Sequence, residues 1–121
     1  PDHADLLYAY ALQRVRAGDN PRALQLLQRA VEKAPDNMQM IYVYAVALHS
    51  AGQLQASNAV LDAGLRRRPT HPDLLFARAS FARDSGDLVQ ARKFAGQLLA
   101  AAPDDPRALE LQRQLQPPAD G

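Results

Sequence analysis

The sequence predicts an all-α fold, an α-solenoid of antiparallel helix hairpins with about seven helices. Three observations indicate this class: a repeat of 34 residues, apolar residues at helical spacing inside each repeat, and glycine or proline at the ends of the helical segments. A repeat of this length is typical of proteins in which each unit buries its apolar face only against its neighbours.

The repeat is visible in five sets of residues that recur at intervals of 34 positions. The sets are Gly18, Gly52 and Gly86; Pro35, Pro69 and Pro103; Ala11, Ala45 and Ala79; Ala23, Ser57 and Ala91; and Leu7, Ile41 and Leu75. We therefore divide the chain into repeats at residues 4–37, 38–71 and 72–105, all within a single domain that spans residues 1–116.

Each repeat has the pattern of two helices. In the second repeat, one helical face is formed by Ile41, Tyr44, Ala45 and Leu48, which follow the spacing i, i+3, i+4 and i+7. Gly52 ends this helix, and Pro69 prevents the second helix from continuing. The small residues of the Ala45 and Ser57 sets predict a close approach of the two helices, because short side chains allow it.

The ends of the helices carry further signals. Asp19 and Asp87 follow turn glycines and are expected to cap the second helices, while Thr70 or His71 is expected to cap the helix that Pro72 begins. Asp104 and Asp105 likewise precede a helix. The segment 106–116 predicts a lone capping helix, and the tail 117–121 predicts disorder. Because the chain begins with Pro1 rather than Met, we expect it to be a segment of a longer protein.

Composition excludes several function classes. Fourteen Lys and Arg residues stand against 13 Asp and Glu residues, so the excess of positive charge that drives nucleic-acid binding is missing. The absence of cysteine excludes disulfides and a thiol nucleophile. The longest apolar run, Met40 to Leu48, is about half of the roughly 20 residues that a membrane-spanning helix needs. We expect a soluble protein without membrane insertion, and the compartment, cytoplasmic or periplasmic, stays open.

Three consecutive arginines, Arg66, Arg67 and Arg68, interrupt this balanced charge pattern. They stand at the end of the second helix of repeat two, where cations interact favourably with the carbonyl groups of the helix terminus. We interpret them as part of the helix end and predict no binding to nucleic acid. The alternative is a basic contact for an acidic partner.

No residue pattern predicts an enzyme, a cofactor or a metal site. The three histidines, His3, His49 and His71, lie at spacings that do not bring them together as ligands. The serines have no glycine-flanked nucleophile elbow, and Ser57 belongs to a small-residue packing set. We therefore predict a non-catalytic protein.

The repeat resembles the tetratricopeptide repeat, a helix-turn-helix unit of 34 residues. The resemblance is carried by "LYAYALQRVRAGDNPRALQLLQRAVEKAP", "IYVYAVALHSAGQLQASNAVLDAGLRRRP" and "LFARASFARDSGDLVQARKFAGQLLAAAP". It implies a right-handed superhelix whose first helices line a concave groove that holds peptides. Parts of the sequence are also similar to repeat modules at the ends of larger bacterial proteins. Two departures stand out: Ala95 and Leu98 exchange large and small positions in repeat three, and Arg14 replaces an apolar residue, which suggests that the first repeat is exposed or meets a preceding repeat.

An aromatic set, Tyr8, Tyr42 and Phe76, also recurs at 34 residues, one position past the core set that contains Leu7. By the resemblance, the stripe around these aromatics lines the groove, whereas the alternative is that the aromatics only fill contacts between repeats. The predicted groove residues are Asp5, Tyr8, Leu12, Val15, Gln39, Tyr42, Val43, Val46, His49, Asp73, Phe76, Ser80 and Arg83.

These features predict an interaction scaffold that binds a peptide or helix segment of a protein partner in an aromatic and apolar groove. One subgroup of the family grips a peptide carboxylate with lysine, arginine and asparagine side chains of the groove. In the first repeat the matching stripe offers Tyr8 and Leu12 instead, so we do not expect that function here. Two alternatives stay open: self-assembly into a homo-oligomer, and an accessory domain of an enzyme on the same parent chain.

Overall fold

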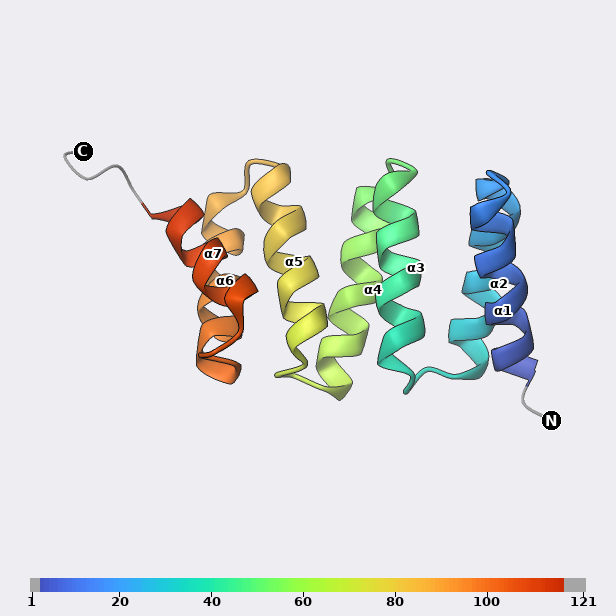
Figure 1. Cartoon of the computed structure of the whole chain (residues 1–121), viewed down its shortest axis with the longest axis horizontal. Helices are drawn as coiled ribbons and strands as arrows, with labels where there is room; N and C mark the ends of the chain where they lie inside the picture. Colours follow the sequence, from blue (N-terminus) through green and yellow to red (C-terminus); the bar gives the residue numbers. More distant parts are fainter. Residues whose placement is uncertain (1–2, 117–121) are drawn as a thin grey trace. The chain divides into compact units, whose positions relative to one another are not determined.

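The computed structural model describes residues 3–116, which form seven helices and no strand. The helices are α1 (His3–Arg16), α2 (Asn20–Lys33), α3 (Met38–Ser50), α4 (Leu54–Arg67), α5 (Pro72–Asp84), α6 (Leu88–Ala101) and α7 (Pro106–Leu115). Figure 1 shows the hairpins α1–α2, α3–α4 and α5–α6, followed by the single helix α7. The prediction of an all-α fold with three hairpins and a lone last helix is confirmed, whereas the predicted tail 117–121 lies outside the described residues.

Glycine makes the turn inside each hairpin. Gly18, Gly52 and Gly86 have φ angles of 80°, 82° and 82°, in the left-handed region that glycine adopts without strain. At the middle turn, the backbone N–H of Gln53 donates to the carbonyl oxygen of Leu48 at 2.9 Å. The chain therefore reverses within three residues, and each second helix starts next to the end of the first.

Side-chain oxygens cap four helix starts by accepting backbone N–H groups that the helix leaves unpaired. The acceptors are Asp19 for Arg22 at 3.3 Å, Asn37 for Met40 at 3.1 Å, Asp87 for Gln90 at 3.2 Å, and Asp105 for Arg107 at 2.9 Å. The capping roles predicted for Asp19 and Asp87 are thus confirmed. At α5 the capping position belongs to His71, not Thr70, and the His71 side chain makes no capping hydrogen bond.

The chain divides into two compact units, and the first contains α1 to α4. In this unit α1 packs on α2, α3 packs on α4, and α2 packs on α3. The α3–α4 contact includes a hydrogen bond from the fully buried Ser57 hydroxyl to the carbonyl oxygen of Ala45 at 2.7 Å. The small side chains thus allow the close approach that the sequence predicts. One core cluster of the unit consists of Ala4, Leu7, Ala11, Leu26, Leu27, Ala30 and Met40.

The second unit contains α5, α6 and α7. Here α6 packs on both α5 and α7, and α7 also reaches α5. Ala95 and Leu98 of α6 are both buried, so the exchanged large and small positions of repeat three keep the interior filled. The last helix closes the unit with three buried residues, Ala108, Leu111 and Leu115.

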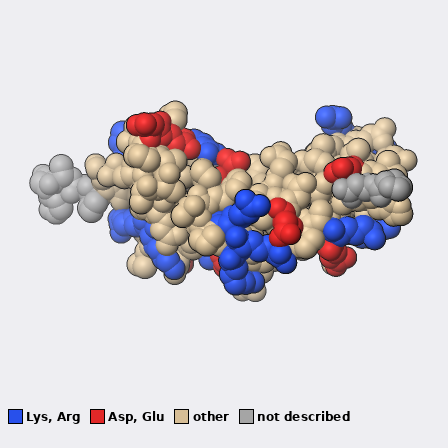
Figure 2. Space-filling model, turned by 90° about the horizontal axis from the view of Figure 1, so that it is seen from below, with Lys and Arg blue, Asp and Glu red and all other residues tan. Residues whose placement is uncertain are grey.

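The arginine run lies at the end of α4, as the sequence predicts, but only Arg66 and Arg67 belong to the helix, which ends at Arg67. Arg67 also forms an exposed ion pair with Asp36, which lies between α2 and α3. On the face drawn in Figure 2, Lys and Arg side chains form several clusters, Asp or Glu side chains lie next to some of these clusters, and much of the remaining surface is uncharged. None of the described helices has the length and apolar composition needed to span a lipid bilayer.

Candidate functional site

An apolar pocket with a volume of about 270 Å³ lies in the first unit, between α1, α2 and α3. Five of the predicted groove residues line it. They are Leu12, Val15, Tyr42, Val43 and Val46. The other lining residues are Asn20, Ala23, Leu24, Ala47, Ser50 and Ala51. The described lining therefore contains no charged side chain, and polar groups come only from Tyr42, Asn20 and Ser50.

Helical spacing brings the predicted pocket residues together. Leu12 and Val15 are three residues apart on α1, and Tyr42 and Val46 are four residues apart on α3, so each pair faces one side of its helix. Because α2 packs on both α1 and α3, residues from the start of α2 also line the pocket. Val15 keeps 43% of its surface exposed. The pocket is thus open to a partner and suited to an apolar group.

The remaining predicted groove residues of the first unit lie outside this pocket. Tyr8 is half-buried and packs against the core cluster described above. Asp5 is exposed in the first turn of α1, Gln39 is exposed near the start of α3, and His49 is half-buried in the last turn of α3. Of these four, Tyr8 fits the alternative in which the aromatic residue fills a packing contact.

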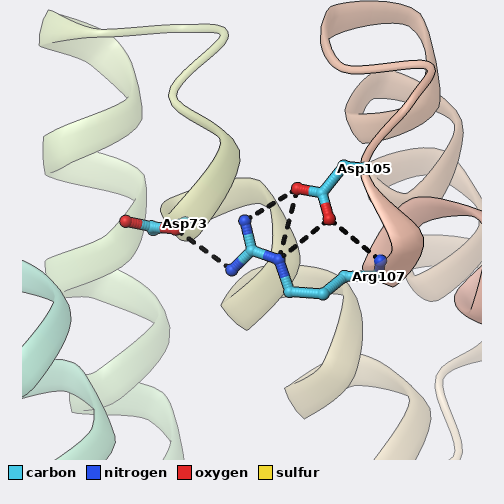
Figure 3. Close-up of polar contacts among 3 residues, drawn as sticks. All are labelled: Asp73, Asp105 and Arg107. Carbon is cyan, nitrogen blue, oxygen red and sulfur yellow. Dashed lines mark hydrogen bonds and ion pairs between the residues drawn. The ribbon is translucent and has the colours of Figure 1, made fainter.

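In the second unit, α7 contacts three of the predicted groove residues. The Arg107 guanidinium lies over the Phe76 ring, with Cζ 4.9 Å from the ring centroid. It also bridges two carboxylates, Asp73 at 3.0 Å and Asp105 at 2.9 Å (Figure 3). The Arg83 guanidinium donates a hydrogen bond to the side-chain oxygen of Gln114. In this part of the predicted groove, Phe76, Asp73 and Arg83 are therefore already in contact with side chains of α7.

Arg107 and the neighbouring Asp105 carboxylate shift each other's pKa values. Hydrogen bonds from the Arg107 side chain and backbone lower the pKa of the Asp105 carboxyl below its usual value. The Asp105 carboxylate in turn raises the pKa of Arg107, with a smaller contribution from Asp73. The arrangement favours the charged forms of both groups and holds the start of α7 against α5. The last predicted groove residue of this unit, Ser80, is buried on α5.

Sequence reasoning missed two features. It placed the stripe on the first helices alone, whereas Asn20, Ala23 and Leu24 of α2 also line the pocket. It also gave no role to Arg107. Arg107 lies in the helix that follows the three repeats, and it does not belong to any set of residues that recurs at 34 positions. The pairing of Asp105 with Arg107 two residues later was the one local signal, because an aspartate before a helix start often accepts hydrogen bonds there.

The predicted absence of a metal site stays a prediction. Within residues 3–116, no group of three or more His, Asp or Glu side chains is arranged to hold a metal ion.

Solved structures with the same fold cover nearly the whole chain. A tetratricopeptide repeat protein from Parabacteroides merdae aligns with 93% of this chain at 23% identity and a TM-score of 0.83, and the chain spans 45% of that protein. The first tetratricopeptide domain of Spaghetti (RPAP3), bound to an HSP90 peptide, aligns with 93% of this chain at 14% identity, with a TM-score of 0.80 and 89% of its own length covered.

The type III secretion chaperone SycD of Yersinia enterocolitica, in complex with a peptide of the translocator YopD, aligns with 95% of this chain. The identity is 16%, the TM-score is 0.79, and 87% of that structure is covered. A search of curated proteins found no match. A sequence profile of the tetratricopeptide repeat matches residues 14–75 and 48–115, which together include most of the chain. With the 34-residue period and the helix hairpins, this match shows that the chain belongs to the tetratricopeptide repeat family.

Proposed function

We propose that this chain is a non-catalytic interaction scaffold that binds an apolar segment of a protein partner in the pocket between α1, α2 and α3. The observation that carries the proposal is the meeting of five predicted stripe residues from two helices in one uncharged pocket. A pocket of this kind favours a segment that inserts large apolar side chains, because charged groups would lose water there without gaining a partner.

The energetics fit a peptide or helix with one or two apolar anchors. Full burial of a leucine or phenylalanine side chain contributes about 1.5–3 kcal/mol. Tyr42 adds an aromatic surface and a hydroxyl at the pocket, which suits recognition of a segment that is apolar on one side and polar on the other. Two of the similar structures, the Spaghetti domain and SycD, contain bound peptides. This likeness supports the proposal that the present chain also binds a peptide.

The second unit supports a restricted site rather than a groove along all three repeats. Phe76, which the sequence groups with Tyr8 and Tyr42, is covered by Arg107, and Asp73 is paired with the same guanidinium. A ligand at Phe76 would have to displace a cation from both an aromatic ring and a carboxylate. We therefore assign the apolar contacts to the pocket in the first unit.

A peptide-display library selected against the protein tests this proposal. We expect the selected peptides to share apolar residues spaced for one face of a helix or for alternate positions of an extended segment. Tyr42→Ala should weaken their binding by about thirtyfold, or about 2 kcal/mol, because it removes the central aromatic anchor. Ser50→Trp should block binding without truncating the core, because Ser50 is exposed at the pocket. Calorimetry measures both effects.

Two variants serve as controls. Tyr10→Ala removes the same side chain from an exposed position of α1 that does not line the pocket, and it should leave peptide affinity unchanged. Arg67→Ala removes an exposed arginine of the run and should also matter little. If Tyr42→Ala and Ser50→Trp bind as well as the wild type while Arg67→Ala loses affinity, the contact surface is the arginine run and the proposal is wrong.

A further inference from the structure

A second pocket lies in the other unit, between α6 and α7, and has a volume of about 390 Å³. Small-molecule sites have volumes of about 300–1,000 Å³, so this volume is sufficient for a small ligand. Four glycine or aliphatic residues and three polar residues line the pocket. None of them lines the pocket assigned to peptide binding, and none is among the predicted groove residues. This second pocket, which we call the α6–α7 pocket, therefore has no role in the proposed function.

The first unit has a surface crevice at the equivalent place, between α2 and α3. Gln28, which stands two repeats before Gly96, lines this crevice. No residue of α4 lines it, although α4 follows α3 and packs on it, and the crevice keeps a volume of about 410 Å³. A further helix after α7 is therefore not expected to fill the α6–α7 pocket. The pocket is distinct from the surface on which a further repeat would pack.

Gly96 keeps the α6–α7 pocket open. The equivalent positions of the first two repeats carry Gln28 and Asp62, so the repeat pattern does not require glycine here. Gly96 has no left-handed φ, and a Cβ built on it would meet no atom of a neighbouring helix within 4 Å. Glycine inside a helix is also less favourable than alanine. Neither the backbone nor crowding within the described chain explains this residue, which leaves room for atoms of a ligand.

The floor of the α6–α7 pocket is aliphatic. Ala95 and Leu115 are only 5% and 6% exposed, and Leu99 is half-buried. The described lining contains no aromatic ring. A short hydrocarbon group that covers this floor is stabilised, because apolar surface is removed from water. This part of the lining therefore favours an aliphatic group.

Arg92 gives the pocket its charge. The described lining contains no carboxylate, and its other polar residues are Gln112 and Gln116. Arg92 donates from Nε to the carbonyl oxygen of Leu115 at 2.9 Å, at the end of α7, and this bond orients the guanidinium. Its two terminal nitrogens have no hydrogen-bond or ion-pair partner within residues 3–116. The contact with α7 thus explains one donor of Arg92, and the remaining donors complement an anionic group.

From these observations we propose that the α6–α7 pocket binds an aliphatic carboxylate. The carboxylate accepts hydrogen bonds from the terminal nitrogens of Arg92, and the hydrocarbon group lies over Gly96, between Leu99 and Leu115. A second copy of the same pocket offers no carboxylate and does not complement Arg92. Two kinds of molecule present the required group: a free aliphatic acid, and a peptide with an acidic residue beside an aliphatic one. The proposal does not depend on the peptide pocket of the first unit.

Three probes with the same hydrocarbon chain test the proposal: hexanoate, hexanol and hexylamine. They differ in the charge of the polar end, and amide NMR spectra of the whole chain follow binding at each residue. We expect hexanoate to shift the backbone amides of Gly96 and Leu99 with a Kd on the order of 1 mM. Hexanol and hexylamine should bind about tenfold more weakly, because the alcohol makes no charge-assisted hydrogen bond with Arg92 and the amine is repelled by it.

Two variants that copy the first repeat each remove one feature of the pocket. Gly96→Gln introduces the residue found at Gln28 and should weaken hexanoate binding about tenfold, because its side chain occupies the open space. It should also raise the melting temperature, since glutamine favours a helix more than glycine does, so lost binding cannot come from unfolding. Arg92→Leu introduces the residue found at Leu24 and should weaken hexanoate binding about tenfold while hexanol binding stays the same.

Lys93→Leu is the matched control, because it removes a neighbouring cation that does not line the pocket, and it should leave hexanoate binding unchanged. Equal binding of the three probes would overturn the proposal, and so would unchanged hexanoate binding in Gly96→Gln and Arg92→Leu. Shifts confined to the amides of Tyr42 and Val46 would mean that the acid binds in the first unit. That result would overturn this proposal and leave the proposed peptide function untouched.

A capped dipeptide of leucine and glutamate separates the two sources of the ligand. A Kd below that of hexanoate assigns the pocket to an acidic segment of a partner, and a Kd above it assigns the pocket to a free acid. Both assignments place the carboxylate on Arg92, so Arg92→Leu should weaken the tighter of the two probes. If Arg92→Leu leaves that probe unaffected, the proposal is wrong.

Discussion

Gly52 determines the turn between α3 and α4 through its backbone alone. Its φ of 82° lies in the region that disfavours side chains, yet a Cβ at this position would meet no atom within 4 Å. A substitution is therefore strained without any steric clash. The same conformation at Gly18 and Gly86 explains why this residue recurs in every repeat.

Gly52→Val should lower the melting temperature by roughly 5 °C. The physical reason is that the left-handed backbone costs an L-residue about 1–2 kcal/mol, and more for a β-branched side chain. Thermal unfolding followed by circular dichroism measures the change.

Gly96→Ala is the control of opposite sign. Gly96 lies within α6, has no left-handed φ, and also has open space where a Cβ would stand, so alanine should stabilise the helix by about 0.5–1 kcal/mol. Equal melting temperatures for Gly52→Val and the wild type would contradict the turn as the reason for the recurring glycine.

Among the elements, α7 is held at both ends by contacts of charged side chains. Its start is held by Asp105, which caps the helix and pairs with Arg107, while Arg107 reaches Asp73 and the Phe76 ring of α5. Arg92 of α6 also donates from Nε to the carbonyl oxygen of Leu115 at 2.9 Å, near the other end of the helix. The attachment of this helix should therefore respond to pH.

The pKa of Asp105 is lower in the folded protein than in the unfolded chain, because Arg107 donates hydrogen bonds to its carboxylate. Its stabilising contribution is therefore present above the unfolded pKa of about 3.9 and is lost as the pH falls through the lower folded pKa. Melting curves between pH 2 and pH 6 should show this loss in the wild type.

Asp105→Asn keeps a good capping residue but removes the titrating charge. We expect the variant to be less stable than the wild type at pH 6, and the difference to shrink as the pH falls below about 4. A difference that stays constant across this range would show that the Asp105 charge does not contribute to the attachment of α7.

At the scale of the whole molecule, charge is balanced. The formal net charge is +1, Asp or Glu side chains lie next to some of the Lys and Arg clusters on the face in Figure 2, and Arg67 of the arginine run is paired with Asp36. Binding to the nucleic-acid backbone requires a cluster of unpaired cations that releases counterions from the phosphates.

We expect no binding of micromolar protein to double-stranded DNA at about 0.15 M salt. Electrophoretic mobility shifts over a series of salt concentrations measure this. A complex that weakens steeply with salt, and that Arg66→Ala or Arg67→Ala also weakens, would mean that the arginine run is a contact surface rather than a helix end.

The sequence by itself determined the hairpins, their turns and much of the core, because these features depend on short-range helix signals repeated three times. Leu7, Ala45 and Ser57 could be placed in the interior from their period and spacing. The tertiary structure decided which parts of the aromatic stripe are open. Tyr42 lines an apolar pocket, whereas Phe76 lies under Arg107, although both have the same position in the repeat.

The physical reason is that a repeat pattern specifies which side of a helix a residue occupies, but not which atoms cover that side. Coverage depends on side chains from helices that do not follow the repeat, such as Arg107 of α7, and on the packing of α2 beneath both α1 and α3. An exposed apolar residue and a buried one therefore have the same sequence signature, and only the arrangement of neighbouring helices within each unit distinguishes them.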